Sequence, residues 1–256
     1  MDIRTTVERA FERWKGSSPD IITRLPQSGS DRVYFRLICR EDQVIGAYNP
    51  SREENEAFVG FSNHFRLKGL PVPEIYIYYP GEKVYFLEDL GDTNLFTWLA
   101  RRPDEERFND ETENLFLTIA GDLVRIQTEG IRGLDLSLCY PHRSFDRQSI
   151  VWDMNYYKYM FLKLIGAPFN ETRLERDFEI LTRYLLDAGQ EYFLFRDFQT
   201  ANIMIRDGKP WYIDYQGGRL GAAQYDIASL VYDAKAYIPE KIRKTTINRH
   251  LDLFAA

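Results

Sequence analysis

The sequence is poor in cysteine and histidine, which excludes several kinds of site. Only two cysteines, Cys39 and Cys139, occur in 256 residues. A secreted disulfide framework needs more cysteines than this, so we expect both thiols to be reduced. The three histidines (His64, His142 and His250) are scattered along the chain, and no spacing typical of a structural zinc site results.

Long apolar runs and basic clusters are also missing. No apolar stretch approaches the roughly 18 residues of a membrane-spanning helix, and acidic side chains stand where a signal peptide would have apolar ones. The net charge is −6, with Lys and Arg scattered, whereas a nucleic-acid surface needs a basic stripe. We therefore expect a cytoplasmic protein that binds neither a membrane nor a nucleic acid.

Three well-known signatures are absent as well. The sequence has no Gly-x-x-x-x-Gly-Lys-Ser/Thr, which excludes a P-loop ATPase, and no Gly-x-Gly-x-x-Gly for a dinucleotide. It also lacks the Gly-x-Ser-x-Gly turn that carries the nucleophile of many hydrolases.

Hydrophobic periodicity divides the chain into two parts near residue 90. The first part reads as helix, two strands, helix and two strands. The second part is helical except for residues 192–215, where short β-type runs surround a turn at 207–210. We expect an α+β, bilobal fold with a small antiparallel-sheet lobe (1–90) and a mainly helical lobe (91–256).

The strand-rich island carries the residues with the clearest chemistry. Arg196-Asp197 is followed after four residues by Asn202, and Asp214 comes at the end of the predicted hairpin. Phosphoryl transfer needs a carboxylate that orients the attacking hydroxyl, and oxygen ligands for Mg²⁺. Asp197 suits the first role, and Asn202 and Asp214 suit the second. The Asp–Asn spacing alone is weak, because it arises often by chance; its position before a hairpin strengthens the interpretation.

Leu194 to Gln216, followed by Tyr225-Asp226, resembles the aminoglycoside phosphotransferase and protein-kinase-like superfamily. Segments 28–36, 72–75 and 88–92, with Ile-Asp-Tyr-Gln at 213–216, are similar to one branch. That branch phosphorylates the anomeric hydroxyl of N-acetylmuramate and N-acetylglucosamine. The resemblance implies a kinase that uses ATP and Mg²⁺, with Asp226 bracing the catalytic loop. It also implies helices beyond residue 255, so we expect either a short member or a piece of a longer protein.

The chain departs from the kinase pattern in two places. Phe195 replaces the histidine that precedes Arg-Asp in protein kinases, and the strand at 43–48 lacks the lysine that steadies the α- and β-phosphates. Arg32 could supply this positive charge, and Ser28, Gly29 and Ser30 could offer backbone N–H groups to phosphates. Without the lysine, Glu54 and Glu56 of the following helix are expected to lie on a solvated face.

The remaining site predictions follow from the resemblance. The backbone of Glu88 and Leu90, at the lobe junction, is expected to contact adenine. The residues expected to reach a small-molecule acceptor, with an amino sugar favoured, are Gln216, Asp233 and Asp153. The aromatic residues Trp152, Tyr156, Tyr157 and Tyr159 could stack on a sugar, although core packing is the simpler expectation.

Two alternatives remain open. A kinase of an aminoglycoside, choline or an amino acid would share the catalytic residues and differ in its acceptor. A catalytically silent pseudokinase would explain the missing lysine and histidine, but it would not explain the retention of Asp197, Asn202 and Asp214.

Overall fold

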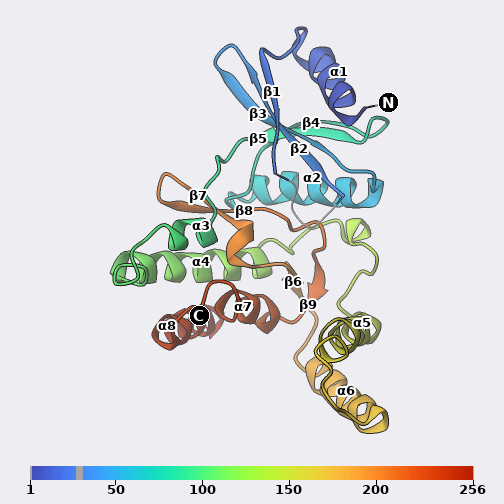
Figure 1. The fold of residues 1–256 in the computed structure, drawn as a ribbon, viewed down its shortest axis with the longest axis vertical. Coiled ribbons are helices and arrows are strands. Elements are labelled where there is room, and N and C mark those ends of the chain that lie inside the picture. The colour runs from blue at the N-terminus through green and yellow to red at the C-terminus, as the bar shows by residue number, and fades with distance from the viewer. Residues whose placement is uncertain (1, 27–30, 256) are drawn as a thin grey trace.

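The computed structural model describes residues 2–26 and 31–255. The predicted phosphate-loop residues Ser28, Gly29 and Ser30 lie outside these ranges. Figure 1 shows a twisted sheet with α1 and α2 at one end of the molecule and a layer of helices at the other. None of the helices in the described ranges is long and apolar enough to cross a membrane.

The N-terminal sheet has five antiparallel strands in the order β1-β2-β3-β5-β4. Sequence periodicity predicted four of them and missed the first. β1 is only four residues long and lies at the sheet edge, largely exposed, so it carries no alternating pattern. The elements of this part are α1 (Ile3–Lys15), β1 (Ile21–Arg24), β2 (Val33–Cys39), β3 (Asp42–Tyr48), α2 (Arg52–Leu67), β4 (Ile75–Tyr79) and β5 (Val84–Glu88).

Two helices cover the sheet. α1 packs through Val7 and Phe11 into the core beneath the sheet, and a Cβ atom at Gly46 of β3 would lie 2.9 Å from the Val7 side chain. Gly46 thus permits a close approach that a larger residue would prevent. Gly16 ends α1 in a left-handed conformation. α2 begins at the N-cap Ser51, whose hydroxyl accepts a hydrogen bond from the backbone N–H of the third helical residue.

The C-terminal part is helical around two small β elements. Its helices are α3 (Leu95–Ala100), α4 (Asp110–Thr128), η1 (Leu136–Leu138), α5 (Arg147–Tyr157), η2 (Lys158–Leu162), α6 (Glu171–Leu186), η3 (Thr200–Asn202), α7 (Gln224–Val231) and α8 (Glu240–Ala255). Its strands are β6 (Tyr192–Leu194), β7 (Ile203–Arg206), β8 (Lys209–Tyr212) and β9 (Arg219–Gly221). β7 pairs with β8 as predicted, and β6 pairs with β9, which the sequence did not indicate.

One hydrophobic cluster joins the two parts. The buried aromatic face of α2 meets the C-terminal part directly, because the Phe58 ring stacks on Tyr215 at 5.0 Å and Phe65 contacts Phe193 edge to face. α2 therefore lies between the sheet and the hairpin (Figure 1). This packing fixes the helix relative to the segment that carries the chemistry.

Candidate active site

A buried carboxylate holds the backbone of the loop that follows β6. Asp226 of α7 is fully buried and accepts hydrogen bonds from the backbone N–H groups of Phe195 (2.8 Å) and Arg196 (2.9 Å). Arg196 has φ = 81°, a conformation that costs energy for a non-glycine residue unless its surroundings hold it. The structure thus confirms that Asp226 braces the loop on which Asp197 lies.

A second layer of polar contacts supports Asp226. The side-chain amide of Gln127 in α4 donates to Asp226 (3.3 Å) and to the Ala223 carbonyl (2.9 Å). The oxygen of the same amide accepts a 2.9 Å hydrogen bond from the Nε2–H of His250 in α8. Burial lowers the pKa of His250 to about 4, so the ring is neutral here. Sequence reasoning missed both residues, because the partners are 99 and 123 positions away from Gln127 in the chain.

Phe195 supports the loop by packing. Its side chain is buried, and its ring meets Phe198 and Tyr215 edge to face at 5.1 and 5.6 Å. A histidine at this position would place a polar ring among these aromatic groups. The departure from the kinase pattern at residue 195 therefore leaves the loop anchored through apolar contacts.

The hairpin brings Asn202 and Asp214 together. Ile203 pairs with Tyr212, and the next backbone hydrogen bond runs from Ile213 N–H to the Asn202 carbonyl (3.1 Å). Asp214 follows at once with φ = 72°, which turns the chain away from the strand direction. The Asn202 side-chain amide donates to the backbone carbonyl of Asp197 (2.9 Å), so all three predicted residues belong to one connected site.

Asp197 lies in a strongly charged environment. Burial raises the pKa of its carboxyl above the ordinary value, and the negative charge of Asp214 raises it further. Arg196 lowers it, and Asp153 raises it. A raised pKa makes a carboxylate a better proton acceptor.

The oxygen atoms at the hairpin mouth fit a magnesium site. The NH₂ of the Asn202 amide donates to the Asp197 carbonyl, which leaves the amide oxygen available, and Asp214 follows the residue whose backbone pairs with Asn202. Mg²⁺ takes few protein ligands and prefers carboxylate and amide oxygens, with waters and phosphates completing the shell. Within residues 2–26 and 31–255, no group of three or more His, Cys, Asp or Glu residues gathers in a way that would hold a metal by itself. The donor set therefore suits a metal that arrives with phosphates.

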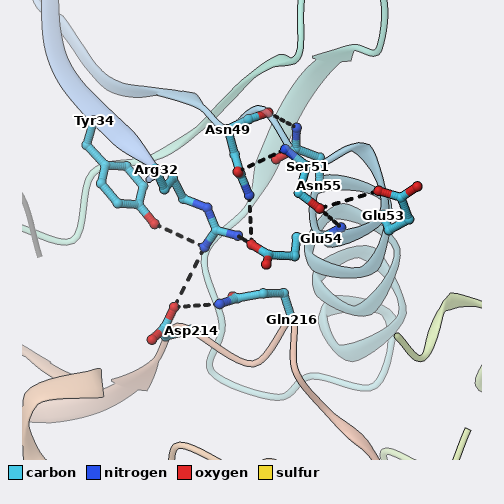
Figure 2. Close-up of polar contacts among 9 residues, drawn as sticks. All are labelled: Arg32, Tyr34, Asn49, Ser51, Glu53, Glu54, Asn55, Asp214 and Gln216. Atoms are coloured by element: carbon cyan, nitrogen blue, oxygen red, sulfur yellow. Dashed lines mark hydrogen bonds and ion pairs between the residues drawn. The ribbon is translucent and has the colours of Figure 1, made fainter. Parts of the chain in front are cut away.

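Arg32 lies beside this site. Figure 2 shows its guanidinium between Glu54 of α2 and Asp214, at 3.2 and 3.6 Å, with the Tyr34 hydroxyl at 3.4 Å. The Glu54 side chain is 41% exposed, as a solvated face requires, but its carboxylate also contacts Arg32 and Asn49, which the sequence did not predict. Glu56 behaves as predicted, since it pairs with Arg52 one turn earlier on the helix surface.

A cavity of about 170 Å³ opens where the two parts join. Glu88 and Leu90 line it, as do Tyr34, Phe58 and Asp214. The Glu88 carboxylate is occupied by Arg206 at 2.5 Å, so an adenine contact from this residue would come from its backbone. The predicted contacts of Glu88 and Leu90 with adenine stay predictions, now attached to a cavity that Asp214 also lines.

Gln216 and Asp233, which were predicted to reach the acceptor, have partners near the catalytic loop. Gln216 donates its amide NH₂ to Asp214 (2.8 Å), while its amide oxygen is buried with no partner among the described residues. Asp233 accepts from the backbone N–H and the hydroxyl of Thr200 and from the backbone N–H of Lys235. Both oxygens of Asp233 are thus engaged, which favours a supporting role over the predicted contact with an acceptor.

Asp153 of α5 occupies the other side of the loop. Its carboxylate accepts a 3.3 Å hydrogen bond from Arg196 and borders an open, mainly apolar cavity of about 700 Å³ between α5, α6 and α7. Core packing was the wrong expectation for the nearby aromatic residues. The structure exposes four of them by 47% or more: Trp152, Tyr156, Tyr157 and Tyr159.

Comparisons with known proteins agree with this architecture. A curated N-acetylmuramate/N-acetylglucosamine kinase from Neisseria meningitidis serogroup B is 28% identical over 152 residues, which is 58% of this chain and 42% of that protein. The matched region thus spans less than half of the length of that relative.

Solved structures share the fold at low identity. A choline kinase from Streptococcus pneumoniae superimposes with a TM-score of 0.65 at 12% identity, covering 95% of this chain and 79% of its own. A thermostable mutant of an aminoglycoside phosphotransferase gives 0.64 at 15% identity, covering 98% and 85%. A structure of that enzyme is a ternary complex with ADP and hygromycin B. These likenesses confirm the predicted α+β, bilobal kinase-like fold.

The model of the phosphotransferase enzyme family matches residues 21–253 of this sequence, nearly its whole length. The match includes the sheet, the catalytic loop and the hairpin described above. This chain belongs to the phosphotransferase enzyme family.

Proposed function

We propose that this chain transfers the γ-phosphoryl group of ATP to a hydroxyl group of a small molecule. The observation that carries the proposal is the connected site of Asp197, Asn202 and Asp214 beside the cavity at the lobe junction. The family match and the ADP-bound relative support nucleotide use. A silent pseudokinase would have no need to keep all three residues in one site.

Each residue has a defined part in the step. Asp197 orients the acceptor hydroxyl and takes its proton as the oxygen attacks the γ-phosphorus; the bond from that phosphorus to the β-phosphate bridging oxygen breaks, and ADP leaves. Asn202 and Asp214 would hold Mg²⁺, which neutralises charge on the phosphates. Glu88 and Leu90 border the adenine through their backbone. Arg32 lies on the phosphate side of the site.

For the acceptor, we propose an N-acetylated amino sugar phosphorylated at its anomeric hydroxyl. The similarity to an N-acetylmuramate/N-acetylglucosamine kinase supports this choice over choline or an aminoglycoside. An anomeric hydroxyl is more acidic than an ordinary alcohol, so one carboxylate suffices as the base. Asp153, which borders the open cavity, and the unpartnered amide oxygen of Gln216 offer hydrogen-bonding groups to a sugar.

The test is to incubate the protein with ATP, Mg²⁺ and N-acetylglucosamine or N-acetylmuramate, with choline and aminoglycosides in parallel. The expected product is acid-labile and no longer a reducing sugar, as a 1-phosphate must be. Phosphorylation at the 6-hydroxyl, or activity on choline or aminoglycosides alone, would refute the acceptor and leave the kinase proposal standing. If none of these acceptors led to ADP formation, the result would count against both the acceptor and the kinase proposal.

A further inference from the structure

Arg32 is a buried cation with incomplete partners. Its side chain is 2% exposed, and its Nε atom has no hydrogen-bond partner among the described residues. A buried charge is costly unless it is paired and hydrogen-bonded. Here the guanidinium faces two carboxylates, Glu54 at 3.2 Å and Asp214 at 3.6 Å (Figure 2). Its charge is therefore compensated, while part of its hydrogen-bonding capacity stays unused.

The contact with Glu54 is held from several directions. The amide of Asn49 donates 2.8 Å to the same carboxylate oxygen that Arg32 contacts. Asn49 is fixed in turn, since its side-chain oxygen accepts from Ser51 N–H and its carbonyl accepts from the Asn55 amide. Glu54 thus has a defined orientation, with its carboxylate aimed at the guanidinium (Figure 2).

The contact with Asp214 differs in kind. At 3.6 Å it is an ion pair longer than a hydrogen bond, and the same Asp214 oxygen accepts the 2.8 Å hydrogen bond from Gln216. Arg32 is thus firmly held on the Glu54 side and loosely held on the Asp214 side. The loosely held side faces the junction cavity, because Tyr34 and Asp214, both partners of Arg32, line it.

We propose that Arg32 binds the phosphates of the nucleotide and that Glu54 is the residue that positions it. This inference rests on the proposed function. A guanidinium matches phosphate oxygens with a planar fork of N–H donors, which an ammonium does not offer. Strand β3 carries no lysine, so the pair formed by Arg32, just before β2, and Glu54 of α2 supplies the missing cation from a different place in the fold. In this role Arg32 exchanges its long contact with Asp214 for the phosphates and keeps Glu54.

The test compares affinity for ATP, with Mg²⁺, against affinity for adenosine, which has no phosphate. The central variant is the charge-balanced double substitution Arg32→Gln with Glu54→Gln, because it leaves no lone buried charge. We expect its ATP affinity to fall roughly 10-fold or more, about the loss of one charge-assisted hydrogen bond. Adenosine affinity is expected to stay within about 2-fold, because the adenine contacts are elsewhere.

Two single variants keep the test decisive if the double variant does not fold. Arg32→Lys retains the charge without the fork, and Glu54→Gln retains Arg32 without its positioning carboxylate; each should lower ATP affinity while adenosine affinity stays unchanged. Glu56→Gln, on the same helix but paired on its surface, is the matched control and should bind as wild type. If the folded variants bind ATP as tightly as wild type, the inference about Arg32 and Glu54 is overturned and the proposed function stands. A wild-type protein that binds no nucleotide overturns the proposed function.

Discussion

The two sides of the catalytic loop, which we propose take the nucleotide and the acceptor, differ in how their side chains are partnered. On the nucleotide side, Arg32, Glu54 and Asp214 form one polar cluster around a small cavity. On the acceptor side, α5 and α6 stand away from the helical layer (Figure 1) and border a much larger apolar cavity.

Exposure shows the same contrast. Large apolar side chains of α5, α6 and the segment between them are exposed by half or more of their surface; examples are Tyr156, Leu164, Ile165 and Tyr184. The catalytic loop beside them is supported by buried groups, from Asp226 through Gln127 to His250. The side proposed to perform phosphoryl transfer is thus closely defined by contacts, and the side proposed to select the acceptor is open. We infer that chemistry and acceptor choice are separable in this protein, and the following predictions test that separation.

The largest effect is expected from Asp197, which lies between the two sides. Asp197→Asn removes the proton acceptor and keeps the shape, so turnover should fall roughly 10²-fold or more. ATP affinity should stay near that of wild type, because the proposed nucleotide contacts lie on the other side of the loop. Steady-state kinetics with calorimetric ATP binding measure both quantities. Near wild-type turnover in this variant would remove Asp197 from the mechanism.

The next prediction concerns His250, which supports the catalytic loop through Gln127 and Asp226, and it depends on pH. Burial places the pKa of His250 at about 4 in the folded protein, below about 6.5 in the unfolded chain. A depressed pKa gives stability that is present above pH 6.5 and is lost as the pH falls toward 4. At pH 5 the loss from this group should be about 2 kcal/mol of unfolding free energy.

Urea unfolding at pH 7 and pH 5 measures this loss. In His250→Gln the acid-induced loss should shrink by about that amount, while in the control His142→Gln, where the side chain is partly exposed, it should stay as in wild type. Equal acid sensitivity in wild type and His250→Gln would show that His250 titrates as it does in the unfolded chain. The effect of burial on the pKa of His250, described above, would then be absent.

A smaller effect is expected from Asp153 on the acceptor side. Asp153→Asn should raise the KM for the acceptor roughly 10-fold, as for one charged hydrogen bond, with ATP affinity unchanged. The control is Asp177→Asn, an exposed position on α6 of the same helical pair. A change in ATP affinity without a change in acceptor KM would reverse the assignment of the two sides.

The sequence could predict those parts of the site whose contacts are local in the chain. The hairpin and the triad of Asp197, Asn202 and Asp214 were predictable because their contacts are local and their spacing follows from strand pairing. The contact between Glu54 and Arg32 was not predictable, because Arg32 lies 22 residues earlier in the chain.

Two other features lay beyond sequence patterns for different reasons. Strand β1 is short and exposed, so nothing in its composition alternates, and only its pairing with β2 makes it a strand. The aromatic residues of α5 were expected in a core, because an apolar side chain is more often buried than exposed. They are exposed since no described element covers that face of the helix, a fact that depends on tertiary packing.

The central claim is that Asn202 and Asp214 hold Mg²⁺ for the phosphates of ATP, and thermal melts test it most directly. The comparison uses wild type and Asp214→Ala, with ATP alone, with Mg²⁺ alone and with both. Asp207→Ala is the matched control, because Asp207 lies in the same hairpin with a similar left-handed backbone (φ = 52°) and an exposed side chain.

The account predicts that ATP stabilises wild type and Asp207→Ala only when Mg²⁺ is present. Asp214→Ala should show no such metal-dependent shift. Equal stabilisation by ATP in all three proteins, with or without Mg²⁺, would contradict the claim and favour a nucleotide-binding protein without catalysis.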